Sequence, residues 1–255
     1  MHKGAVFLFL ILMSGISIAS TKISCNNREY AGAKLDFFQY SDPVTKTTDL
    51  VFSLVFDQNG KSSAEFNTTI TDYVFCDFGV YRGMLFMEPD KAMELLLPPN
   101  REKSFADQKN PYFTPVSFWI KTKNEDQLND DISNFTQQFN FLNDKYFNQL
   151  YFRQSKEIYD SLVYFIDRDF GKINSPAFLL HKNMKLKMLE MDAFRQKPEQ
   201  NSALFSTIST QFWMHPAFID IFDKTFTGQL SFEVKSIGGN QVGIAVNKGD
   251  VIALQ

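Results

Sequence analysis

The stretch from Asp72 to Pro99 constrains the fold most, because short apolar runs alternate there with turn residues. Short runs bounded by Gly, Pro and Asp are typical of β-strands rather than helices. The sequence therefore predicts three consecutive strands, broken at Arg82-Gly83 and Pro89-Asp90. These strands cover Tyr73–Val80, Met84–Glu88 and Ala92–Leu97.

The first of these strands has one wholly apolar face. Side chains alternate across a strand, so Val74, Cys76, Phe78 and Val80 point to the same side. We expect this side to face the core. Cys76 is therefore expected to be a buried core residue rather than a reactive thiol.

The residues before Asp72 repeat the strand pattern. Asn59-Gly60 supplies the positive φ of a tight hairpin, and the segment after it alternates apolar and polar side chains. Phe66 lies on the apolar side of that segment, and we expect it to be buried. Short strands at this spacing predict an antiparallel β-sandwich of the Ig or prealbumin kind over residues 21–99. The further strands expected are Lys22–Asn26, Lys34–Tyr40, Asp49–Phe56 and Ser62–Ile70.

Residues 100–122 are expected to form a connector between the sandwich and a helical domain. Pro111 and Pro115 keep this segment extended. Its aromatic side chains, among them Phe118 and Trp119, either pack the connector onto the rest of the protein or line a ligand groove.

Residues 123–255 are expected to form that helical domain, which makes the fold class α+β. Apolar side chains recur there at spacings of four and three, as on one face of an amphipathic helix. Phe139 lies in the middle of this stripe, and we expect it to be buried in a core separate from that of Phe66. Helices are expected over 127–170, as one helix or as two with Ser155 as the second N-cap, from Ser175-Pro176 to about Phe194, and after Pro216.

The tail from Leu230 to Gln255 reads differently from the helices before it. Phe232–Val234 and Val242–Val246 resemble short strands, and Asp250 resembles a helix N-cap five residues before the end. We therefore expect the helical domain to be truncated at its C-terminus.

Residues 1–20 have the pattern of a secretory signal peptide. Lys3 is the positive start, Ala5–Met13 is the apolar run, and Ser17–Ser20 offers small residues for cleavage. The apolar run is too short to span a membrane comfortably, so no stable transmembrane span is expected after cleavage. A lipid anchor on Cys25 is the lesser alternative. The sequence predicts an exported protein of the periplasm or cell envelope.

Cys25 and Cys76 are the two cysteines of the chain. In an oxidising compartment they form a candidate disulfide, closing a loop of about 50 residues and stabilising the fold by ~4 kcal/mol in the chain-entropy model. The alternative is two buried free thiols.

Known catalytic and binding motifs are missing from the sequence. There is no Cys-x-x-Cys, His-Glu-x-x-His, Gly-x-Ser-x-Gly or phosphate-binding glycine loop. His181 and His215 are far apart in sequence, without the cysteines or carboxylates of a metal site. The net charge of −3 argues against a nucleic-acid partner. We expect no catalytic residue, cofactor or metal, and a binding protein rather than an enzyme.

Several motifs resemble a known protein family. The motifs are Asp57–Gly60 followed by Ala64–Phe66, Tyr73–Gly83, Met87–Lys91, Leu96–Pro99, Asn110–Val116 and the Phe-rich helix up to Phe147. They resemble the N-terminal sandwich and helical region of exported Bacteroidetes proteins, many of which carry a TlpA-like thioredoxin domain downstream. This resemblance implies an envelope protein of mainly uncharacterised role. The chain lacks the thioredoxin domain and its Cys-x-x-Cys, so no catalytic residue is transferred.

The sequence leaves alternative functions open. The first is an exported, non-catalytic binding or scaffold protein of the bacterial envelope, with a protein or envelope partner. The second is the N-terminal portion of a TlpA-like thiol–disulfide oxidoreductase without its catalytic domain. A third, a sugar-binding sandwich, depends on aromatic residues such as Tyr81, Tyr112 and Trp119.

Overall fold

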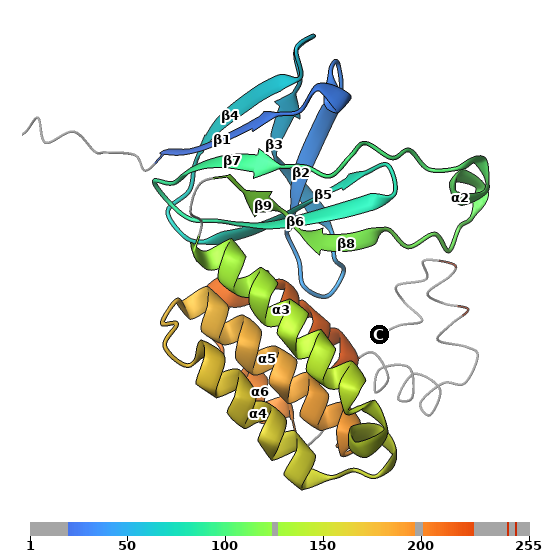
Figure 1. Ribbon diagram of the computed structural model, residues 1–255, viewed down its shortest axis with the longest axis vertical. Helices are drawn as coiled ribbons and strands as arrows, with labels where there is room; N and C mark the ends of the chain where they lie inside the picture. Colours follow the sequence, from blue (N-terminus) through green and yellow to red (C-terminus); the bar gives the residue numbers. More distant parts are fainter. Residues whose placement is uncertain (1–19, 124–126, 197–200, 227–243, 245–247, 249–255) are drawn as a thin grey trace, which may run out of the picture.

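The computed structural model describes residues 20–123, 127–196 and 201–226, together with Ile244 and Lys248 (Figure 1). Apart from Ser20, the expected signal peptide lies outside the described residues. So do the expected tail strands, apart from Ile244, and the expected N-cap at Asp250.

The protein is a mixed α+β fold with two β-sheets, as the sequence predicts. The strand orders are β4-β1-β7-β9 and β3-β2-β5-β6-β8. Each sheet includes a parallel pair, β1 with β7 and β6 with β8, so the expectation of purely antiparallel sheets is wrong. The strands are β1 (Ser20–Asn26), β2 (Lys34–Tyr40), β3 (Thr48–Val55), β4 (Lys61–Asn67), β5 (Asp72–Phe78), β6 (Tyr81–Met87), β7 (Ala92–Leu96), β8 (Val116–Trp119) and β9 (Lys121–Thr122).

The Asn59-Gly60 turn forms, but it does not join the two strands of a hairpin. The Asp57 carboxylate accepts hydrogen bonds from the Asn59 and Lys61 N–H groups, both at 2.8 Å, and Gly60 has φ 76°. β3 then pairs with β2 and β4 pairs with β1, so the turn carries the chain from one sheet to the other.

The turn after β5 lies earlier than the sequence predicts. Gly79, with φ 53°, turns the chain, and the expected break at Arg82-Gly83 lies within β6. Arg82 donates to both carboxylate oxygens of Asp77 at 2.6 Å, across the antiparallel pair of β5 and β6. Arg82 is therefore a cross-strand partner and not a turn residue.

Residues 100–122 are more than the expected connector, because they supply two strands. β8 joins the five-stranded sheet and β9 joins the four-stranded sheet. Between these strands Ile120 is buried in the core that the two sheets share. A short helix, α2 (Phe105–Lys109), precedes them and has a capping box of Ser104 and Asp107.

The helices lie against one side of the five-stranded sheet (Figure 1). Ser155 is the N-cap of α4 (Lys156–Phe170), as expected, and accepts a hydrogen bond from the Ile158 N–H. The helices are α3 (Gln127–Lys145), the π-helix η2 (Asn148–Phe152), α4 (Lys156–Phe170), α5 (Pro176–Ala193), α6 (Ser202–Phe205), the 3-10 helix η4 (Thr210–Phe212) and a helix over residues 216–226.

Both faces of β5 are buried. Val74, Cys76 and Phe78 face the core between the two sheets, as predicted. Tyr73 and Phe75, on the other face, belong to a second core with Phe86, Trp119 and residues of α3, α4 and α5. The five-stranded sheet therefore has the other sheet on one face and the helices on the other.

Phe66 and Phe139 lie in different cores, as the sequence predicts, but neither is fully buried. Phe66 is half-buried and stacks on Phe52 at 5.1 Å between ring centroids, since its strand β4 lies at an edge of its sheet. Phe139 is half-buried and packs against Phe135, which fills the centre of the second core. The expectation of full burial is wrong for both side chains.

Within the described residues, no helix combines the length and the apolar character that crossing a membrane requires.

Candidate functional site

The junction between the five-stranded sheet and the helices holds two buried histidines. His181 lies on α5, and His215 lies just before the helix over residues 216–226. Their ring centroids are 5.6 Å apart. The exposed fraction is 2% for His181 and 5% for His215, so both imidazoles are shielded from water.

Aromatic side chains from the sheet and from α3 surround this histidine pair. The His215 ring lies 5.0 Å from that of Phe86. The His181 ring lies 5.7 Å from Trp119 and 5.6 Å from Phe135, both edge-on. These surroundings offer little solvation to a charged imidazole, so they favour the neutral form.

Burial lowers the pKa of both histidines. The pKa of His215 falls to about 3; hydrogen bonding to the Ala177 backbone partly offsets the shift, and Lys185 adds to it. The pKa of His181 falls well below its ordinary value because of burial, with smaller contributions from His215 and Lys185. Both side chains are therefore neutral near pH 7.

The hydrogen bonds of His215 define its tautomer. Its Nδ1 accepts a hydrogen bond from the Ala217 N–H at 3.1 Å, so the single ring proton of the neutral form is on Nε2. That Nε2 lies near the Ala177 backbone without the geometry of a full hydrogen bond, and among the described residues neither ring nitrogen of His181 has a partner. Since buried polar groups are nearly always satisfied, these three atoms mark an unusual place.

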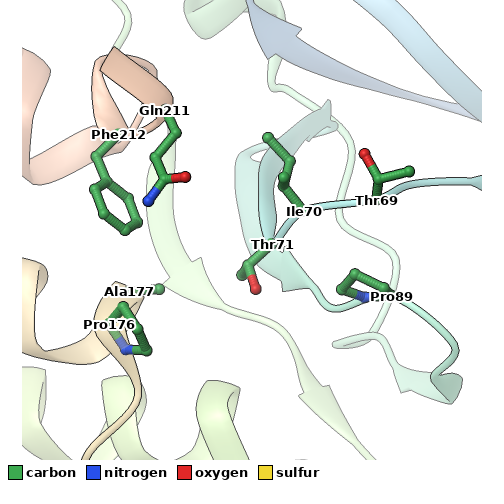
Figure 2. Close-up of a pocket in the computed structure, with 8 residues that line it drawn as sticks. All are labelled: Thr69, Ile70, Thr71, Pro89, Pro176, Ala177, Gln211 and Phe212. Atoms are coloured by element: carbon green, nitrogen blue, oxygen red, sulfur yellow. The ribbon is translucent and has the colours of Figure 1, made fainter. Parts of the chain in front are cut away.

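A pocket opens to the surface next to this pair, and we call it the junction pocket. It has a volume of about 260 Å³. Figure 2 shows Gln211 and Phe212 on one side of the opening and Ile70 and Thr71 opposite them. The lining comes from the loop after β4 (Thr69, Ile70, Thr71), from Pro89, from the start of α5 (Pro176, Ala177) and from η4 (Gln211, Phe212).

A smaller cavity, which we call the inner void, shares lining residues with the junction pocket. Thr71, Ala177, Gln211 and Phe212 line both spaces. The inner void has a volume of about 20 Å³, enough for about one water molecule. Its other lining residues are Asp72, Tyr73, Phe86, Met214 and His215.

Asp72 is the carboxyl group of the inner void. Burial raises its pKa, and a hydrogen bond from the Thr68 hydroxyl, 2.7 Å long, partly opposes this shift. The other lining residues with polar side-chain groups are Thr71, Tyr73, Gln211 and His215. Such groups bind by hydrogen bonding and packing. Among the residues that the structure describes, no three His, Cys, Asp or Glu side chains gather closely enough to hold a metal ion.

The cysteines singled out from the sequence lie elsewhere, in the core between the two sheets. Both are free thiols and both are buried. Burial raises the pKa of Cys25 to about 11, with a smaller effect from Glu94, and raises that of Cys76 to about 12, with a smaller effect from Asp77. Few thiolates therefore exist near neutral pH. The pairing of Cys25 with Cys76 stays a prediction.

The aromatic residues considered for sugar binding do not form one surface. Trp119 is buried in the junction, stacked on Phe86 at 5.3 Å. Tyr112 is 88% exposed, and Tyr81 packs against Phe78 and Phe118. Trp119 thus packs in the junction, although it and Phe118 also line a pocket next to Leu96 and Pro98.

Sequence reasoning missed the histidine pair because its two members come from distant segments. The signal available was limited to two histidines next to apolar residues, Leu180 before His181 and Met214 before His215. Neither the pocket-lining Thr71 nor Gln211 belongs to a recognisable motif.

No family model matches the chain, and no curated protein or solved structure matches it either.

Proposed function

We propose that the protein is an exported, non-catalytic binding or scaffold protein of the bacterial cell envelope, with a ligand site in the junction pocket. The observation that carries this proposal is the pocket itself, an open space of about 260 Å³ that shares lining residues with a small void beside His215. Ligand sites commonly combine an apolar lining with a few convergent polar groups.

The chemistry of the pocket favours binding over catalysis. A general acid or base works best when its pKa lies near the operating pH. The pKa of His215 is about 3, so it is a fixed hydrogen-bond donor at neutral pH and not a proton shuttle. Thr69, Thr71 and Gln211 add hydroxyl and amide groups with no charge.

The same proposal includes the fold type and the cellular location of the protein. The two sheets form a sandwich of the Ig or prealbumin kind, and the helices are an addition to it. The signal-peptide pattern of residues 1–20 and the resemblance to exported Bacteroidetes proteins support an envelope location. If the chain is instead the front of a TlpA-like oxidoreductase, the described residues are the scaffold of that enzyme. The reading frame after the codon for Gln255 distinguishes the two.

The binding proposal is tested with a chain that begins at Ser20. Ligand-observed NMR is used to screen it against neutral amides, alcohols and methyl glycosides, together with organic anions and cations. Gln211→Trp fills the pocket from an exposed position on η4, and Thr210→Trp is the matched control, since Thr210 is exposed and outside the lining.

We expect at least one probe class to bind the parent chain and Thr210→Trp but not Gln211→Trp. Absence of binding by every class, or binding unchanged by Gln211→Trp, would contradict the proposal.

A further inference from the structure

We propose that the loop over residues 102–115, which we call the aromatic loop, docks on an anionic phospholipid surface, with Phe105 and Tyr112 entering the membrane interface. This inference goes beyond the proposed function. It concerns a lipid partner, and no residue of the aromatic loop lines the junction pocket.

Both ends of the aromatic loop are held at Val80. The Val80 N–H donates to the Arg101 carbonyl at 3.0 Å, and the Val80 carbonyl accepts from the Val116 N–H at 2.9 Å. Gly79 permits this close approach, since a Cβ at that position would collide with the Arg101 carbonyl oxygen. The chain therefore leaves and rejoins the sheet at one point, as in an Ω-loop, and Figure 1 shows α2 at the far end of this excursion.

Hydrogen bonds within the aromatic loop fix its shape. The Gln108 side chain donates to the Lys103 carbonyl at 3.0 Å. The Asn110 side-chain oxygen accepts from the Tyr112 N–H at 2.9 Å, and the Asn110 carbonyl accepts from the Phe113 N–H at 3.1 Å. The capping box of α2 adds to these contacts. The loop is thus preorganised, which lowers the entropy lost when a surface binds to it.

The apolar side chains of the aromatic loop are turned to solvent. The exposed fraction is 77% for Phe105 and 88% for Tyr112, and it is 60% for Val116, where the loop ends. In the part of the chain that the structure describes, no residue from 102 to 115 belongs to a hydrophobic core. Large apolar side chains that are grouped on one projecting segment mark an interaction surface.

Lysine side chains accompany the aromatic rings. The Lys103 Nζ lies 4.5 Å from the centre of the Phe113 ring, and the Lys109 Nζ lies 5.7 Å from that of Phe105. Rings beside lysines are typical of the membrane–water interface, where the ring enters the head-group region and the ammonium group meets lipid phosphate. The pairing of rings and cations on the loop therefore matches an anionic lipid surface.

The charge of the aromatic loop and its base is opposite in sign to that of the chain. From residue 101 to 115 the three basic residues Arg101, Lys103 and Lys109 outnumber the two acidic residues Glu102 and Asp107, which gives +1 against −3 for the whole chain. Anionic lipid should therefore attract the loop and repel the rest of the protein, which orients the molecule with the loop toward the membrane.

The size of the aromatic loop favours lipid over a folded protein partner. A protein–protein interface of ordinary size takes about 20–30 residues from each side, which is more than the loop contains. A lipid surface needs only the tip, because binding there grows with the apolar area that enters the interface and with the attraction of basic groups to anionic lipid.

The experiment is co-flotation of the chain from Ser20 with vesicles of phosphatidylcholine alone or mixed with phosphatidylglycerol. The expected signal peptide is omitted because its apolar run would itself bind lipid. Phe105→Ser with Tyr112→Ser removes both rings of the aromatic loop. The matched control is Phe141→Ser with Tyr164→Ser, which removes rings that are 63% and 65% exposed on α3 and α4.

We expect the parent chain and the control to float with the phosphatidylglycerol vesicles, and the aromatic-loop variant to bind them at least tenfold more weakly. Lys103→Gln with Lys109→Gln should also weaken binding, and salt should weaken binding of the parent. Brominated lipid should quench the added tryptophan of Phe105→Trp, whereas the tryptophans of the parent should stay unquenched. All these positions are exposed or half-buried, so the variants should keep the circular dichroism of the parent.

Several results would overturn the proposal. The first is a parent chain that does not float with phosphatidylglycerol vesicles. Equal binding to both vesicle compositions would contradict the preference for anionic lipid. Equal loss of binding in the aromatic-loop variant and the control would show that exposed rings act without regard to their place. An unquenched Phe105→Trp would contradict entry of the loop into the interface.

Discussion

The side chain of Asn129 satisfies both backbone groups of Phe86, with its Nδ2 donating to the Phe86 carbonyl at 2.7 Å and its Oδ1 accepting from the Phe86 N–H at 2.8 Å. β8 pairs with β6 only as far as Met84, whose carbonyl accepts from the Ile120 N–H at 2.9 Å. Asn129 takes the next position along β6. A helix side chain thus continues the hydrogen bonding of the sheet and fixes α3 to it.

Replacing Asn129 by Ala should destabilise the protein by about 2–4 kcal/mol, because two buried backbone groups of Phe86 lose their partners. The change is measured as the free energy of unfolding in urea. Asn134→Ala is the control, since Asn134 is exposed on the same helix and its loss should cost less than about 0.5 kcal/mol. Equal effects of the two substitutions would show that the Asn129 bridge does not stabilise the junction.

Stability should fall as the pH falls from 7 to 5. The unfolded chain binds protons at its histidines near pH 6.5, whereas His215 in the folded chain binds one only near pH 3. The unfolded state therefore holds more protons between these values, and acid favours unfolding. The expected loss for His215 is about 2 kcal/mol between pH 7 and pH 5, and His181, whose pKa is also lowered by burial, adds to it.

This pH dependence of stability arises from His181 and His215, and their contribution can be distinguished from that of other titratable groups. Lys185 adds to the shift of both histidines, while the raised pKa of Asp72 acts in the opposite direction and at lower pH. His181→Phe should remove part of the loss. Denaturant unfolding of the chain from Ser20 at several pH values measures it, and stability that is constant or rises toward pH 5 would contradict the expected pH dependence.

Cys25 and Cys76 should resist thiol reagents in the native protein, because burial raises the pKa of both thiols to about 11 or above. A disulfide-exchange dye should react slowly in buffer and label both cysteines in denaturant.

The same assay on protein exported into an oxidising compartment, denatured without reductant, tests the pairing. Two reactive thiols would exclude the disulfide, whereas none would establish it. Insulin reduction that is lost in Cys76→Ser would contradict the inert character of the thiols.

Export should leave a mature N-terminus at Ser20 or Thr21. β1 begins at Ser20 and lies between β4 and β7, so cleavage there leaves an inner strand of the four-stranded sheet whole. N-terminal sequencing of protein from the native host measures the site. Retention of Met1 in most of the material would refute export with cleavage.

Local features of the sequence predict the elements well, and non-local pairing limits the prediction. Alternation and turn residues identify β1 to β7, because these signals lie within each segment. The sequence does not predict β8 and β9, because they are short and are defined by distant pairing partners, Tyr81–Met84 and Leu95–Leu96. For the same reason Asn59-Gly60 predicts a turn but cannot predict that β3 and β4 belong to different sheets.

The candidate site is harder to predict than the fold. Tyr73 and Phe75 are large and apolar, which hints that the second face of β5 is covered, but the covering helices come much later in the chain. His181 and His215 meet because the helix over residues 216–226 packs on α5, with Ala217 and Ile221 in one cluster with Met184 and Met191. No spacing in the sequence encodes such a contact.

The helices and the sheets should unfold as one body, because they share the core at the junction. Phe86 belongs to this core and is 2% exposed, so Phe86→Ala should cost about 3–5 kcal/mol. The test is thermal unfolding of Phe86→Ala and its parent in a Trp213→Phe background, where Trp119 is the remaining tryptophan. Helical circular dichroism and Trp119 fluorescence should give one coincident transition, shifted equally in the variant. Two transitions, with the helical signal unaffected by Phe86→Ala, would contradict a single body around the junction.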